Sequence, residues 1–242
     1  MFGGLPIQNR DITRLGITGI RQRGLWMRGT GATSMSGTTG LYAGSVLTTD
    51  NTRNRGRNKF GAYYEAITSS VIGNNAGHVF NPTASNFTAL ELPGLHKFAF
   101  GFDRVTNIRA FIGLSATTIL ASGIDADNLS ANSFGIQFST DRGDTTFQLV
   151  SFNGSQTTTP TTITPVAARL YEVIFYWVES TTVFVELREY TNPGSYVVYT
   201  GKITTNLVTS TTDLTQNFGC ESRSAATLSL FSYGVESYVL AL

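Results

Sequence analysis

The sequence predicts an all-β protein, an antiparallel jelly-roll-like β-sandwich preceded by an extended N-terminal arm. Three observations predict this fold. Short segments of alternating apolar and polar residues recur along residues 61–242, turn-forming Gly, Asn and Asp residues separate them, and no long segment shows the period of a helix. Strands spaced in this way are typical of sandwiches and jelly rolls.

The first 60 residues differ from the rest of the chain. They contain many Gly residues, including a low-complexity loop at 29–40, and their apolar residues follow no sustained period. They carry nine basic and two acidic residues, a net charge of +7, whereas residues 61–242 carry −6. This asymmetry predicts two parts with different roles: an extended basic arm over residues 1–60 and a sandwich domain over residues 61–242.

Alternating segments predict the strands of the sandwich in order. We expect strands at residues 60–67, 97–103, 107–114, 134–138, 145–150, 171–178, 182–190, 196–203 and 227–242. Phe98, Phe100 and Phe102 share one face, which predicts that they lie in the core. Residues 171–178 are apolar on both faces apart from Glu172. Such a segment predicts a central strand that is covered on both sides or lies at an interface.

The composition contains enough apolar residues for a core that needs no disulfide and no metal site. Hydrophobic residues make up 41% of the chain, and they include sixteen Phe and ten Tyr. Cys220 is the single cysteine, so an intrachain disulfide and a cysteine-based zinc site are excluded, and we expect a buried residue in a strand. The start of the chain does not resemble a signal peptide, and no apolar run is long enough to span a membrane, so we expect no membrane segment.

One part of the sequence resembles a known kind of domain. It contains the segments Arg109-Ala110-Phe111-Ile112-Gly113-Leu114-Ser115, Phe134-Gly135-Ile136-Gln137-Phe138-Ser139-Thr140, Asp141-Arg142-Gly143-Asp144-Thr145, Phe147-Gln148-Leu149-Val150 and Asn153-Gly154-Ser155. This pattern is similar to the concanavalin-like lectin sandwich that recurs in structural proteins of tailed bacteriophages. The similarity extends from about residue 61 to the C-terminus. It implies a location in the virus particle and often a trimer.

The sequence carries no recognisable catalytic motif. A glycosidase needs two carboxylates about 5–10 Å apart on one cleft, and laminarinase-like members of the superfamily carry Glu-x-Asp-x-Glu, which is absent. Glu186 and Glu189 are three residues apart and so point to opposite faces of a strand, while Glu172 and Glu179 are isolated. Nucleophile elbows and phosphate-binding loops are also absent. We therefore expect no enzyme, no catalytic residues and no cofactor.

Three further features have simple structural interpretations. Asp125, Asp127 and Asn128 predict a solvated loop, with a single bound cation as the alternative, because the remaining ligands of a calcium loop are missing. His78 and His96 lack ligand partners at metal-binding spacing, and we expect both in loops or at strand edges. The tripeptide at 142–144 matches an integrin-type motif, but its place between two strands predicts a hairpin turn.

We expect a structural protein of the virion, a decoration or cement protein that binds the major capsid protein through its arm and assembles in the host cytoplasm as a homotrimer. The alternative is a tail-fibre or tail-tip module that recognises host surface glycan, for which Tyr171, Tyr176, Trp177 and Tyr199 are available. Nucleic-acid binding by the cluster at 53–59 is less favoured, because the cluster lacks interleaved aromatic residues. The residues expected to contact the partner are Arg10, Arg14, Leu15, Ile17, Arg21, Arg23, Leu25, Trp26, Arg28, Arg53, Arg55 and Arg57.

Overall fold

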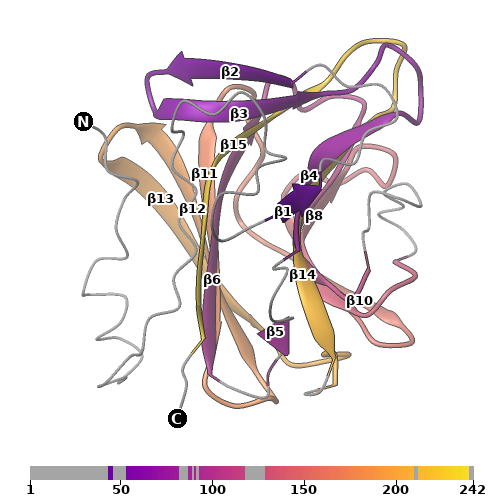
Figure 1. Ribbon diagram of the computed structural model, residues 1–242, viewed down its shortest axis with the longest axis vertical. Coiled ribbons are helices and arrows are strands. Elements are labelled where there is room, and N and C mark those ends of the chain that lie inside the picture. Colours follow the sequence, from indigo (N-terminus) through magenta and orange to yellow (C-terminus); the bar gives the residue numbers. More distant parts are fainter. Residues whose placement is uncertain are drawn as a thin grey trace.

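Two antiparallel sheets face each other and form a sandwich (Figure 1). The computed structural model describes residues 43–45, 53–81, 87–88, 90, 93–117, 129–209 and 212–239. Neighbouring strands in both sheets pair antiparallel, and many of them are distant in sequence. The predicted all-β sandwich is therefore confirmed.

The strands divide into a seven-stranded and an eight-stranded sheet. The seven-stranded sheet has the order β13 (Ser195–Ile203), β12 (Val183–Asn192), β11 (Leu170–Trp177), β6 (Gly94–Phe102), β15 (Ser229–Val239), β3 (Gly61–Ile67) and β2 (Arg53–Asn58). The eight-stranded sheet has the order β1 (Ala43–Ser45), β4 (Asn75–Asn81), β14 (Asp213–Ser222), β7 (Ile108–Ser115), β8 (Ser133–Ser139), β9 (Gln148–Phe152) and β10 (Gln156–Pro160), and β5 (Phe87–Thr88) pairs with β14.

The core lies between the inner faces of the sheets and is rich in phenylalanine. The three alternating Phe residues of β6 are fully buried, as predicted. Rings from the two sheets meet edge to face, with centroid distances of 5.1 Å between Phe98 and Phe218 and 5.7 Å between Phe134 and Phe175. Because full burial of one such side chain contributes about 1.5–3 kcal/mol, this aromatic layer accounts for much of the stability of the sandwich.

Strand β11 is covered on both faces, which explains its continuous apolar sequence. Val173 and Phe175 are fully buried on the inner face, and Glu172 and Ile174 are almost fully buried on the outer face. The strand lies between β12 and β6 in the seven-stranded sheet. The apolar sequence of β11 therefore follows from its central position in the sheet, and a partner chain is not needed to explain this sequence.

Part of the predicted arm belongs to the sandwich. Residues 53–58 form β2, which pairs with β3 at the edge of the seven-stranded sheet, and residues 43–45 form β1, which pairs with β4. A boundary after residue 60 is therefore too late. The sequence pattern did not reveal these strands because β2 contains Arg, Asn and Gly in place of alternating apolar residues.

Strands β4, β10 and β14 were also not predicted, although β14 is central in its sheet. Leu214, Phe218 and Cys220 point inward along β14 and are fully buried, as expected for Cys220. Burial raises the pKa of the Cys220 thiol. Within the described ranges, no helix has the length and apolarity needed to cross a membrane.

Candidate functional site

The expected partner-binding residues fall into two groups. Arg53, Arg55 and Arg57 take alternate positions on edge strand β2 and pair with Ala66, Tyr64 and Ala62 of β3. The end of this strand is fixed to the sandwich, because Asn58 Nδ2 donates a 2.6 Å hydrogen bond to Tyr233 Oη. The remaining members lie outside the described residues: Arg10, Arg14, Leu15, Ile17, Arg21, Arg23, Leu25, Trp26 and Arg28.

A buried ionic cluster lies on the outer face of the seven-stranded sheet. Glu172 of β11 accepts from Lys97 Nζ at 2.6 Å and from Arg188 Nη1 at 2.9 Å, and Arg188 also binds Glu186 at 2.5 Å. Tyr190 Oη donates to the same Glu172 carboxylate at 3.2 Å. Burial, reinforced by the Glu172 charge, raises the pKa of the Tyr190 hydroxyl.

The ionic cluster corrects the view of Glu172 as an isolated acid. Its two acids and two bases are each at most 8% exposed and balance in charge. A buried carboxylate that accepts from two charged donors and a tyrosine hydroxyl has its oxygens occupied by contacts within the sheet. Glu186, Arg188 and Tyr190 are two residues apart, so they lie on one face of a strand. This spacing was the sequence signal from which a polar cluster could have been predicted.

A second charged cluster joins three segments of the eight-stranded sheet. Arg223 binds both Asp141 and Glu221 at 2.7 Å. Arg109 of β7 lies 3.2 Å from Asp141 and 3.6 Å from Glu221. Both acids of this cluster are therefore paired with arginines.

The Arg-Gly-Asp tripeptide forms the turn between β8 and β9, as predicted. The two side chains bind each other, with 2.9 Å from Arg142 Nε to Asp144 Oδ1 and 2.6 Å from Nη2 to Oδ2. Asp144 Oδ2 also accepts from the backbone of Ser139, and Gly143 has a φ of 77° that suits glycine. Arginine and aspartate therefore bind each other and close the hairpin.

The outer face beside this turn contains two buried donors without an acceptor in the described part of the chain. They are Gln137 Nε2 and Arg109 Nε. Gln137 is paired with Phe111 across β7 and β8, and its Oε1 lies 3.4 Å from Arg142 Nη1. A hydroxyl or water oxygen would satisfy both donors.

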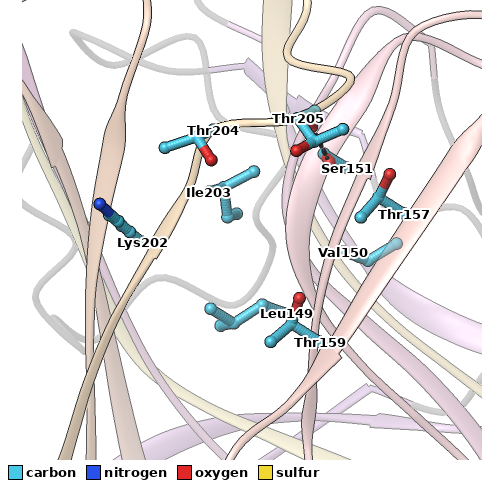
Figure 2. Close-up of a pocket in the computed structure, with 9 residues that line it drawn as sticks. All are labelled: Leu149, Val150, Ser151, Thr157, Thr159, Lys202, Ile203, Thr204 and Thr205. Atoms are coloured by element: carbon cyan, nitrogen blue, oxygen red, sulfur yellow. Dashed lines mark hydrogen bonds between the residues drawn. The ribbon is translucent and has the colours of Figure 1, made fainter.

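A small hollow opens between the end of β13 and strands β9 and β10 (Figure 2). Its volume is about 60 Å³, and methyl and hydroxyl groups such as those of Thr157, Thr159 and Thr204 line it. Ser151 Oγ closes one side by donating to the Thr205 carbonyl at 2.6 Å. Because ligand pockets usually enclose about 300–1,000 Å³, this hollow suits water and no larger molecule.

The histidine prediction is wrong for His96. This residue lies on β6 inside the sandwich and is fully buried. Gln216 Nε2 donates to His96 Nδ1 at 3.1 Å. Burial lowers the pKa of His96 to about 3, so the ring is neutral at physiological pH. His78 lies on β4, opposite Phe218.

The structure describes only some of the residues that were expected to bind a cation or a glycan. Asp125, Asp127 and Asn128 lie outside the described residues, and among the residues that are described no cluster of three His, Cys, Asp or Glu could hold a metal ion. Of the candidate sugar-binding aromatics, Tyr171 and Trp177 belong to the core, whereas Tyr176 and Tyr199 are half-buried.

The fold is shared with solved structures that differ strongly in sequence. The protein of unknown function SO2946 from Shewanella oneidensis MR-1 is 15% identical, with a TM-score of 0.58 and coverage of 100% of this chain and 97% of that one. The PL-14 alginate lyase from Aplysia kurodai is 10% identical, with a TM-score of 0.56 over 85% and 92%. The exoplasmic/lumenal domain of VIP36, in a Ca2+/Man3GlcNAc-bound form, is 9% identical, with a TM-score of 0.50 over 80% and 83%.

These likenesses show a shared β-sandwich fold and no closer relationship. No protein-family profile and no curated protein matches the chain. Since an alginate lyase and a domain solved in a Man3GlcNAc-bound form share the fold, the fold alone does not decide between binding and catalysis.

Proposed function

We propose that the chain is a non-catalytic structural protein of a tailed-bacteriophage particle, a decoration or cement protein that contacts the capsid shell through its basic N-terminal region. The observation that carries the proposal is the position of the basic cluster. Arg53, Arg55 and Arg57 belong to edge strand β2, so this part of the basic region is held by the sandwich. Such an edge supports contact with an acidic protein surface, where charge steers the approach.

The state of the acids supports a structural role over a hydrolytic one. Glu172, Glu186, Asp141 and Glu221 are each bound to arginine or lysine. Such carboxylates maintain the sheet faces and are not available as a pair of catalytic groups.

The proposal is tested with particles that lack the native protein. The full chain should bind them in hundreds of copies, and a variant without residues 1–42, which retains every described strand, should bind much more weakly. A triple Arg→Gln variant at positions 53, 55 and 57 should show a weaker salt dependence of binding. Binding in a dozen copies or fewer would instead indicate a tail location, and undiminished binding by both variants would refute the role of the basic region.

The second candidate is a module that recognises host glycan. The observation that favours it is the likeness in fold to VIP36 in its Man3GlcNAc-bound form. A glycan array tests it: specific binding that the matching free sugar inhibits would support it, and an array without specific binding would exclude it for the glycans present.

A further inference from the structure

Strand β13 ends the seven-stranded sheet and exposes apolar residues. Tyr196, Val197 and Val198 are 47%, 54% and 46% exposed, and Phe184 of the adjacent strand β12 is 40% exposed. Because successive residues of a strand point to opposite faces, exposure of all three shows that both faces of the strand are open. Phe184 pairs with Lys202, four residues along β13 from Val198, so the exposed apolar group at the edge itself is the run from Tyr196 to Val198. Three consecutive exposed apolar residues on an edge strand suit a protein contact.

The edge lacks the features that usually prevent strand addition. Natural edge strands are protected by proline, inward-pointing charges, bulges or short length. Strand β13 has nine residues, no proline and no acid, and Lys202 near its end is its one charged residue. Its register with β12 is regular from Ile203 to Tyr196, and the irregularity lies beyond, between Tyr190 and Asn192.

We propose that β13 pairs antiparallel with β13 of a second copy of the chain about a two-fold axis at Val198, so that the two seven-stranded sheets continue into one. This register gives every exposed apolar residue a suitable partner. Val198 lies opposite Val198 of the second copy, Val197 opposite Tyr199, and Tyr196 opposite Thr200. Aromatic and β-branched residues form favourable cross-strand pairs, and a two-fold interface is closed and self-complementary.

The single charge selects the antiparallel direction. In an in-register parallel pair, Lys202 would lie about 5 Å from its counterpart, at the spacing of neighbouring strands. In the antiparallel pair it lies opposite Gly194, and the two lysines are eight residues apart along the strands, roughly 27 Å at 3.4 Å per residue. That separation exceeds the Debye length of about 8 Å at physiological salt, so the repulsion is screened.

Flanking aromatic residues extend the contact beyond one strand. Phe184 of β12 and Tyr176 of β11 stack at 5.2 Å on the outer face, one and two strands from the edge strand β13. A nine-residue ladder is roughly 30 Å long, but a standard interface buries about 800 Å² per partner, which is more than one strand offers. We therefore expect a dimer that dissociates in the micromolar range. This inference does not depend on the particle role, since it concerns the opposite edge of the sheet from β2.

Disulfide trapping tests the register directly. Opposed residues in antiparallel strands have Cα atoms about 4.5–5.5 Å apart, within the range of about 4.4–6.8 Å that a disulfide accepts. The full-length Val198→Cys variant should form crosslinked dimers under mild oxidation, because the native Cys220 is buried. The matched control is Ile72→Cys, at an apolar residue that is 59% exposed and lies in the turn between β3 and β4. Equal crosslinking of the two variants would overturn the proposal.

Sedimentation equilibrium gives the second measurement. The unmodified chain should approach about 52 kDa, twice its 26.1 kDa mass, as concentration rises, and Val198→Lys should weaken association at least tenfold. Ile72→Lys introduces the same charge at a similar exposure and should associate as the unmodified chain does. A monomer up to millimolar concentration, or a trimer that persists in Val198→Lys, would overturn the proposal.

Discussion

The rings of His96 and Trp177 lie stacked inside the sandwich, with centroids 5.2 Å apart and an angle of 9° between their planes. The same imidazole accepts a hydrogen bond from Gln216, which belongs to β14 of the facing sheet. Because Nδ1 accepts this bond, Nε2 carries the ring proton of the neutral form. A neutral histidine therefore joins the two sheets through the core.

We predict that His96 makes the protein sensitive to mild acid. Its pKa is about 3 in the folded protein and about 6.5 when unfolded, so between these values the unfolded state binds a proton that the folded state does not. The stability contributed by neutral His96 is fully present above pH 6.5 and is lost by about 1.4 kcal/mol per unit as the pH falls toward 3. Urea unfolding at pH 7, 6, 5 and 4 measures this slope.

The matched variant for this experiment is His96→Gln, which retains a hydrogen-bonding side chain without a titrating group. We expect it to be less stable at pH 7, because the contact with Trp177 is lost, and to approach the unmodified protein as the pH falls. Parallel pH dependence of the two proteins would show that His96 does not titrate in this window.

Removing the central acid of the buried ionic cluster should be costly. Glu172→Gln preserves shape but leaves Lys97 and Arg188 without their shared carboxylate. Loss of one partner from a buried ion pair usually destabilises by about 3–5 kcal/mol. The control is Glu189→Gln, whose partner Arg169 lies 3.8 Å away and is partly exposed, and we expect a change of about 1 kcal/mol or less. Denaturant unfolding of both variants compares them, and equal losses would contradict the prediction.

Gly113 should not tolerate a side chain. A Cβ atom at this position would lie 2.3 Å from the Phe134 carbonyl oxygen and 2.6 Å from Gly135 Cα, and backbone atoms cannot move aside. We expect Gly113→Ala to destabilise by about 3 kcal/mol or more. Gly154→Ala has open space and a φ of 81°, so it should lose about 1–2 kcal/mol through backbone strain alone. A reversed order in thermal or urea unfolding would refute the close strand contact.

We predict no cleavage of common polysaccharides, alginate included. Alginate is a strict test, because an alginate lyase has a similar fold. Incubation should give no unsaturated or reducing ends above buffer background. Turnover that disappears in Arg109→Met or Gln137→Leu, while the folded state persists, would instead reveal a catalytic site on the eight-stranded sheet.

Strands with an uninterrupted apolar alternation were predictable. The inward sets on β6, β8 and β12 follow the two-residue period and are buried as expected. Strand β14 was not predicted because polar residues interrupt its apolar alternation. Gln216 lies on the inward face among apolar residues, and the outward face carries Thr215, Asn217 and Glu221. The polarity of Gln216 is compensated by His96 from the opposite sheet, and a long-range partner of this kind leaves no local sequence signal.

The candidate sites were less predictable than the core. The basic residues of β2 were recognised as a contact cluster, but their strand pairing depends on β3 and not on their own period. The members of the buried ionic cluster come from three strands. Lys97 lies 75 residues before Glu172 and 91 before Arg188, so spacing along the chain could not reveal that they meet. The turn at Arg142–Asp144 was predictable because its two ends are adjacent in sequence.

The position of β15 has a consequence for synthesis on the ribosome. This strand, at residues 229–239, pairs with β6 on one side and β3 on the other, and it lies within the seven-stranded sheet. Until it emerges from the exit tunnel, β3 and β6 cannot be joined, and the Phe residues of β6 remain accessible to other nascent chains. Folding of this sheet therefore waits for residues 229–239, and chains that stop before residue 229 should yield products that chaperones retain or proteases degrade.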